Sequence, residues 1–146
     1  MKRDNRLSGM LHLLLHMAQA REPLTSETLA RALNTNPVVI RRTMAGLRER
    51  GYVRSEKGHH GGWTLACDLG DITLFDVYEA LGRPEVVALG NRQNMPECQV
   101  EQAVHSALGS AFEEARALLW RRLREVTLAQ LLERIREGSF DDSACL

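Results

Sequence analysis

The chain has 146 residues with 19 basic and 19 acidic side chains, so its formal net charge is zero. This length suits one domain that buries its own core, and no apolar run approaches the ~20 residues of a membrane span. The amino terminus lacks the apolar segment of a secretory signal, and three widely spaced cysteines give no disulfide framework. We therefore expect a cytoplasmic protein with reduced thiols and no membrane association.

The charges are unevenly divided along the chain. Residues 1–62 hold 11 Lys and Arg against 5 Asp and Glu, whereas residues 63–146 hold 8 against 14. A basic half is typical of a surface that binds phosphates, and an acidic remainder keeps the rest of the molecule away from them. The amino-terminal half is therefore the expected nucleic-acid-binding part.

The first predicted element is a helix that packs behind the segment following it. Its apolar residues recur at helical spacing: Leu7, Leu11, Leu14 and Met17 or Ala18. Within this helix His12 and His16 are four residues apart, a spacing that metal sites use. No carboxylate or cysteine shares their face, so we expect no metal there.

Residues 25–50 have the pattern of a helix-turn-helix. Thr25 or Ser26 is available to cap a first helix, whose apolar edge is formed by residues 29, 30 and 33. Asn36 is a suitable cap for a second helix, and Pro37 fits its first position, where no N–H is needed. The second helix has one inward stripe and ends at a glycine suited to left-handed backbone. These positions are Ile40, Met44, Leu47 and Gly51.

The second helix and the segment after it carry the expected DNA contacts. Residues 52–55 and 63–66 favour strands, and residues 56–62 form a glycine-rich turn between them, which together predict a β-hairpin wing. The side chains left outward near the start of the helix suit a major groove, and those of the turn suit a sugar-phosphate backbone. The expected DNA-binding residues are Thr35, Asn36, Pro37, Val38, Arg41, Arg42, Lys57, His59, His60 and Gly61.

The rest of the chain is predicted to be helical. Thr73 begins a short helix, with Leu74, Val77, Tyr78 and Leu81 inward, and residues 82–84 stop it. Residues 83–99 lose periodicity and form a loop, and another helix begins at Thr127. The fold class is mainly α with a small β-wing. Residues 1–82 form a winged helix-turn-helix domain, 100–137 a dimerisation helix and a C-terminal helix, and 138–146 a flexible tail.

The long helix after the loop carries an apolar seam in steps of four and three residues, as in helices that pack along one another. The seam consists of Val104, Leu108, Ala111, Ala115 and Leu118. We expect it to form a homodimer that places two recognition helices on a palindromic site. The alternative is that the protein's own wing domain covers the seam.

These motifs together resemble the Rrf2 family of bacterial winged helix-turn-helix transcription regulators. The resemblance spans nearly the whole chain and rests on the amino-terminal helix and on residues 47–53, 61–66, 72–81, 98–101 and 126–132. It implies a DNA-binding homodimer, usually a repressor, whose long helix crosses its partner. Arg41 stands where some members carry Glu, so the operator is expected to differ from theirs.

The resemblance also raises the question of a cofactor. Members that bind an iron–sulfur cluster carry three cysteines in the loop before the long helix, whereas here only Cys98 lies there. Cys67 follows the wing and Cys145 is next to last, so we expect no iron–sulfur cluster and no other cofactor. A mixed site that joins Cys98 to histidines or to a carboxylate such as Asp4 stays open.

The sequence thus predicts a sequence-specific DNA-binding transcriptional regulator that acts as a homodimer on a palindromic operator. It shows no set of nucleophile, base and orienting group, so we expect no enzyme. The effector is unknown and could be a small molecule, a redox change or another protein. Two alternatives remain: a thiol redox sensor through Cys98 at the start of the long helix, and a winged-helix module that binds a protein.

Overall fold

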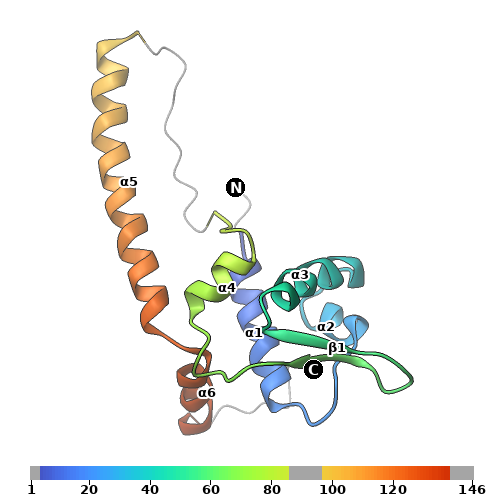
Figure 1. Ribbon diagram of the computed structural model, residues 1–146. Coiled ribbons are helices and arrows are strands. Elements are labelled where there is room, and N and C mark those ends of the chain that lie inside the picture. Colours follow the sequence, from blue (N-terminus) through green and yellow to red (C-terminus); the bar gives the residue numbers. More distant parts are fainter. Residues whose placement is uncertain (1–3, 86–96, 139–146) are drawn as a thin grey trace.

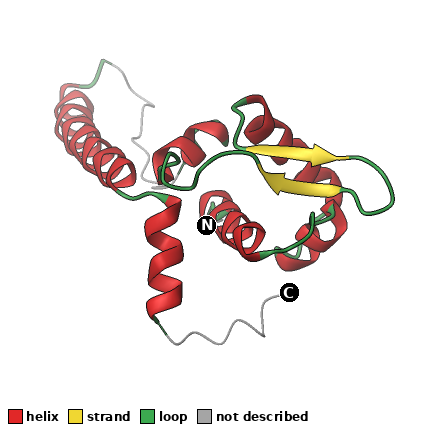
Figure 2. Cartoon of the chain, turned by 60° about the horizontal axis from the view of Figure 1, so that its bottom comes forward, coloured by secondary structure: helices red, strands yellow, loops and turns green. Residues whose placement is uncertain are grey.

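The computed structural model describes residues 4–85 and 97–138 (Figure 1). A body of short helices and a β-hairpin carries one long helix that projects away from it, as two views agree (Figures 1 and 2). The expected fold, mainly helical with a small wing, is confirmed. In chain order the elements are α1 (Arg6–Gln19), α2 (Ser26–Ala32), α3 (Pro37–Glu49), β1 (Val53–Glu56), β2 (Gly62–Leu65), α4 (Leu74–Ala80), α5 (Gln99–Glu125) and α6 (Leu128–Glu137).

Helix α1 forms the centre of the body. It contacts β2, α4 and α6, and its buried residues form one stripe at helical spacing: Met10, Leu13, Leu14 and Met17. Leu13 and Leu14 are completely buried, whereas Leu7 and Leu11 are only partly covered. The buried stripe is therefore rotated from the expected one: Leu14 and Met17 belong to both, and Met10 and Leu13 join the core although they were not expected there.

The helix-turn-helix begins and ends where the sequence predicts. The Oγ1 atom of Thr25 accepts a hydrogen bond from the Thr28 amide at 3.1 Å, so Thr25 caps α2. The Oδ1 atom of Asn36 accepts one from the Val38 amide at 2.8 Å and caps α3. Gly51 follows α3 with φ of 78°, the left-handed conformation expected of it.

The wing is an antiparallel pair in which Val53 lies opposite Leu65. Its second strand also pairs with the segment before α2, because Trp63 and Leu24 exchange backbone hydrogen bonds of 2.8 and 3.1 Å. The backbones approach so closely that a Cβ on Gly62 would lie 2.7 Å from Leu24 backbone atoms. The indole Nε1 of Trp63 donates to Ser26 Oγ at 3.0 Å, and both residues are buried. These contacts hold the wing against the helix-turn-helix.

The long helix leaves the body and the chain then returns to it. The segment before α6 pairs with the segment before α4: the Leu74 amide donates to Val126 O and the Leu128 amide to Ile72 O, both at 2.9 Å. Leu128 consequently belongs to the core, and α6 packs on α1. No residue of α5 is buried. No helix in the described part of the chain is long and apolar enough to cross a membrane.

Replacing Ser26 by Ala should destabilise the protein by about 1–3 kcal/mol, because the buried Trp63 N–H would lose its acceptor. Urea unfolding followed by circular dichroism measures the change. Ser55→Ala, on the exposed side of β1, is the control and should shift stability by less than about 0.5 kcal/mol. Equal stability of both variants would show that this hydrogen bond does not hold the wing.

Candidate DNA interface

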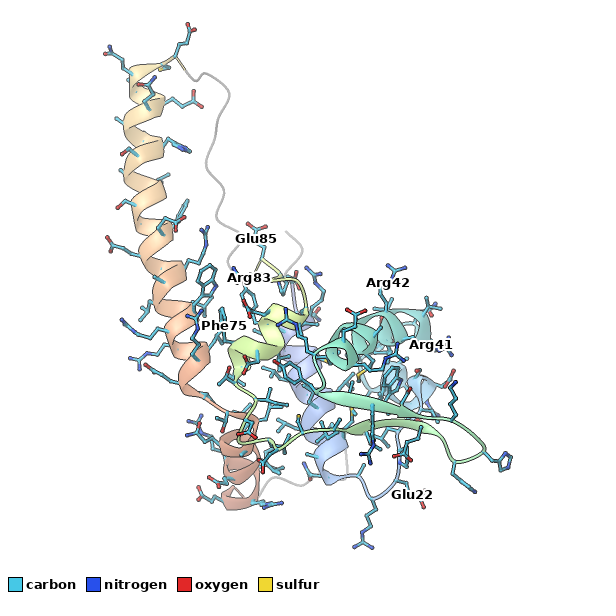
Figure 3. The ribbon with its side chains drawn as sticks, viewed as in Figure 1. Glu22, Arg41, Arg42, Phe75, Arg83 and Glu85 are labelled. Carbon is cyan, nitrogen blue, oxygen red and sulfur yellow. The ribbon has the colours of Figure 1, made fainter. Side chains whose placement is uncertain are left out.

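The outer face of α3 carries the residues that the sequence assigns to DNA. Ile40, Met44 and Leu47 are buried against the body, which turns Val38, Arg41 and Arg42 to solvent. Figure 3 shows Arg42 projecting outward from α3, whereas Arg41 lies on the side of α3 that faces Glu27 of α2. An exposed helix face with two arginines near its amino-terminal end has the shape and charge of a helix that enters a major groove.

The two arginines differ in their surroundings. Arg41 Nη2 lies 2.7 Å from Glu27 Oε1, an ion pair between α3 and α2. No carboxylate in the described ranges lies within ion-pair distance of Arg42. Glu27 was not expected at this site, because the two partners are 14 residues apart in the chain and nothing in the helical spacing joins them.

The turn before α3 exposes Thr35 and Asn36, whereas Pro37 is partly covered. This end of the helix presents the positive pole of its dipole, which favours phosphate oxygens nearby. The Asn36 side chain already satisfies the Val38 amide. The structure therefore gathers all the predicted α3 contacts on one end and one face of the helix.

The turn of the wing is also exposed. Lys57, His59 and His60 are open to solvent, and the two imidazole rings lie 5.5 Å apart at an angle of 76°. A Cβ on Gly61 would lie 2.2 Å from Glu56 O, so the tight turn requires glycine at this position. Strand β1 contacts α3, so the wing and the recognition helix are neighbouring parts of one surface.

The predicted seam on α5 is exposed along its whole length. Val104, Leu108 and Leu118 are 50%, 39% and 47% exposed, and Ala111 and Ala115 are exposed as well. The described residues of the same chain thus leave the seam uncovered, which speaks against coverage by the protein's own wing domain. A different face of α5 meets α4, where the rings of Phe75 and Trp120 lie 6.0 Å apart.

Phe75 was not among the inward residues expected for α4, yet it is 5% exposed. It is buried because α5 covers it, and the periodicity of α4 alone gives no sign of that neighbour. The guanidinium of Arg124 lies 3.7 Å from the centre of the Phe75 ring, and Arg83 lies over both Phe75 and Trp120. This aromatic and cationic cluster anchors the carboxyl-terminal half of α5 to α4.

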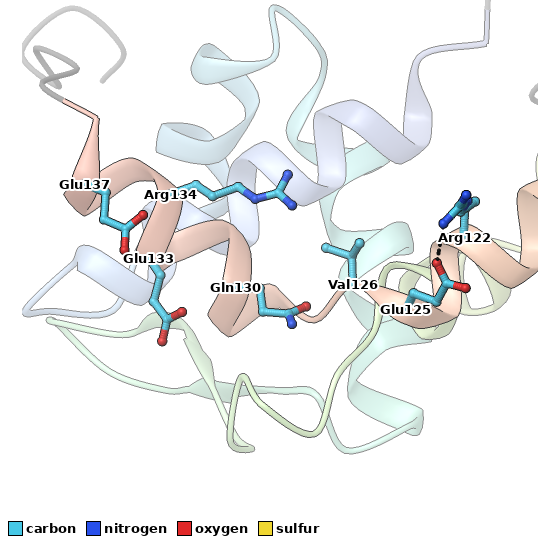
Figure 4. Close-up of a pocket in the computed structure, with 7 residues that line it drawn as sticks. All are labelled: Arg122, Glu125, Val126, Gln130, Glu133, Arg134 and Glu137. Carbon is cyan, nitrogen blue, oxygen red and sulfur yellow. Dashed lines mark hydrogen bonds and ion pairs between the residues drawn. The ribbon is translucent and has the colours of Figure 1, made fainter.

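The hollow at the elbow between α5 and α6 has a volume of about 560 Å³ (Figure 4). It is lined by two arginines, three glutamates, Gln130 and Val126, and Arg122 and Glu125 form an ion pair of 3.0 Å there. Small-molecule sites are lined mainly by apolar side chains. This lining, with Val126 as its one apolar member, does not have the character of an effector site.

Two of the three cysteines lie in the described ranges, in different surroundings. The Cys67 thiol donates a hydrogen bond to Tyr52 O at 3.5 Å, and burial raises its pKa, which disfavours the thiolate that binds metals. Cys98 is partly buried as the residue immediately before α5, and Cys145 lies outside the described residues. Hydrogen bonds from Arg6 lower the pKa of Asp4 and occupy its carboxylate. Across residues 4–85 and 97–138 no three His, Cys, Asp or Glu side chains form a metal-binding group.

The family model of Rrf2, described as an iron-dependent transcriptional regulator, matches residues 3–134 of the chain. The chain belongs to the Rrf2 family. Among its relatives, YffB of Lactococcus lactis is 31% identical over 137 residues, which cover 91% of this chain and 88% of YffB. YwnA of Bacillus subtilis is 29% identical over 132 residues, covering 90% and 98%. Both are described as HTH-type transcriptional regulators.

The fold is shared with solved structures. A transcriptional regulator from Lactobacillus plantarum superimposes with a TM-score of 0.73 at 23% identity, covering 92% of this chain and 91% of the other. By the family model and the relatives YffB and YwnA, this Rrf2-family protein is a DNA-binding transcription regulator and not an enzyme. The family description names iron, and the three cysteines of this chain stand far apart in the sequence, at positions 67, 98 and 145.

Purified with or without oxygen, the protein should be colourless and should lack stoichiometric iron, because the sequence before α5 offers one thiolate instead of three. Absorption spectra and iron analysis after reconstitution with iron and sulfide measure this. Visible absorbance that disappears in Cys98→Ser but persists in Cys67→Ser would contradict the expectation and establish a mixed-ligand cluster.

Proposed function

We propose that this Rrf2-family regulator binds a palindromic operator as a homodimer and acts as a repressor. The observation that carries the proposal is the exposed pair Arg41 and Arg42 on the outer face of α3, beside a glycine-rich wing. Arginine forms bidentate hydrogen bonds with guanine and with phosphate. The exposed lysine and histidines of the wing turn suit the sugar-phosphate backbone next to the groove.

The homodimer is supported by the exposed seam of α5. A helix of 27 residues with none buried leaves a row of valine, leucine and alanine side chains in water, and a second copy would remove that apolar surface from solvent. Two copies related by a twofold axis would present two α3 helices to DNA. Such an arrangement requires half-sites about one helical turn apart.

Binding to a protein instead of DNA is the competing function. The basic face would then serve only solubility. The dependence of binding affinity on salt concentration distinguishes DNA binding from protein binding. Each phosphate contact releases counterions and steepens the plot of log affinity against log salt by about 0.9. The pair Arg41 and Arg42 favours DNA, since guanidinium groups without full carboxylate pairing suit phosphates and base edges.

Replacing both Arg41 and Arg42 by Ala should abolish specific operator binding while leaving the fold intact. Each arginine contact contributes about 1–3 kcal/mol. The probe is the duplex that the wild-type protein selects from a random pool, titrated at near-physiological salt. Arg134→Ala with Arg136→Ala, two exposed arginines of α6, is the control and should bind as wild type. Unchanged affinity in the Arg41 and Arg42 variant would remove the DNA-binding role of this helix.

Ala111→Glu should make the protein monomeric or unfolded, because a charge in the centre of the seam would be desolvated without a partner. Operator affinity should fall, since two half-sites are no longer bound together. Light scattering measures the mass and circular dichroism the fold. Ala117→Glu, exposed on the other side of the same helix, is the control and should remain dimeric. A folded, dimeric Ala111→Glu protein would show that the dimer uses another face.

A further inference from the structure

Two neighbouring arginines of α3 are held differently, although both are exposed. Arg41 donates from Nη2 to Glu27 Oε1 at 2.7 Å, and the side chains of the two residues remain 55% and 60% exposed. Arg42 has no such carboxylate within ion-pair distance in the part of the chain that the structure describes. One arginine of the recognition helix is therefore bound in a fixed direction and the other is not.

The carboxylate that holds Arg41 stands on a fixed backbone. Glu27 lies in the first turn of α2, directly after Thr25, which caps the helix, and Ser26, which bonds to the wing through Trp63. Helices α2 and α3 pack on one another. The Glu27 carboxylate is thus positioned relative to α3 by the cap, the buried hydrogen bond and the helix packing.

Stability gives little reason for this ion pair. An exposed pair contributes only about 0–1 kcal/mol to folding, because water screens it and two long side chains lose freedom. Its larger effect is on what Arg41 can bind. A guanidinium has five N–H donors in a planar fork, so a carboxylate on one terminal nitrogen leaves other donors available and also draws the group toward α2.

A carboxylate beside Arg41 also changes its preference between ligands. Phosphate competes directly with Glu27 for the positive charge, and a second anion brought near the carboxylate is repelled. A guanine edge presents neutral acceptors, O6 and N7, in a fixed geometry that suits a pre-oriented guanidinium. Arg41 paired with Glu27 is therefore suited to a base edge, whereas Arg42, which has no carboxylate partner among the described residues, is suited to a phosphate.

We propose that Glu27 is a specificity-determining residue: it positions Arg41 for a base edge of the operator and keeps it from acting as a phosphate contact. This inference rests on the proposed function and deepens it. Glu27 itself need not touch DNA, and it acts through Arg41. Helix α2 thereby contributes to the choice of sequence made by α3.

The test compares wild type, Glu27→Gln, Arg41→Ala and the double variant on two probes. One probe is a duplex selected from a random pool by the wild-type protein, and the other is a 26-bp duplex of scrambled sequence. Glu27→Gln keeps the size of the side chain and removes its charge. Glu22→Gln is the matched control: Glu22 is exposed before α2 and lies far from Arg41 (Figure 3).

Glu27→Gln should bind the scrambled duplex several-fold more tightly, because the released Arg41 of each protomer takes one more phosphate. The plot of log affinity against log salt should be steeper by about 0.9 per protomer, which is about 1.8 for the dimer. Its discrimination between the selected and scrambled duplexes should fall about ten-fold or more, the effect of losing one good base contact. In the Arg41→Ala background the same substitution should change neither quantity. Glu22→Gln should behave as wild type.

Equal discrimination by wild type and Glu27→Gln would overturn the inference and leave the proposed function standing. An effect of Glu27→Gln that persists undiminished in the Arg41→Ala background would also overturn it, since the carboxylate would then act by its charge alone. If the wild-type protein selects no duplex from the random pool, the proposed function fails and the inference fails with it.

Discussion

The architecture of this regulator depends on the pairing of Trp63 with Leu24. A two-stranded hairpin alone is barely stable in water, and here a third segment completes it through two backbone hydrogen bonds. The same tryptophan bonds to Ser26 at the start of α2, while Arg48 of α3 lies 6.0 Å from its ring. One residue of the wing therefore touches both helices of the helix-turn-helix, and the recognition surface keeps its shape because these parts share a buried side chain.

Local chemistry made most of the elements predictable. Asn36 followed by Pro37 and, later in the chain, Thr127 mark helix starts in the sequence, and the structure confirms both. The structure adds that Thr127 and Gln130 form a capping box. The contacts that depend on distant partners were not predictable. Glu27 meets Arg41 and Phe75 meets Trp120 only because the helices pack, and the periodicity of one helix says nothing about which helix lies against it.

The same limit applies to the candidate site. Residue types and spacing placed Arg41 and Arg42 together on an exposed face, because the inward stripe of α3 leaves them no other side. Their different environments emerged only with α2 in place. For the cysteines, in contrast, the sequence alone was informative, because their wide spacing argued against a common site. The hydrogen bond from the Cys67 thiol to Tyr52 O adds a separate structural role for one of them.

The return of the chain after α5 has a geometric consequence. At the carboxyl-terminal end of α5, residues 72–74 pair with residues 126–128. The cluster of Phe75, Trp120 and Arg124 packs beside this pairing. Together these contacts attach this end of α5 to the body. At 1.5 Å per residue the helix is about 40 Å long. A tilt of only ~5° at the carboxyl-terminal end of α5 would displace its amino-terminal end by roughly 3–4 Å over that length. A small repacking of the side chains at the carboxyl-terminal end of α5 would therefore cause a much larger displacement of its amino-terminal end.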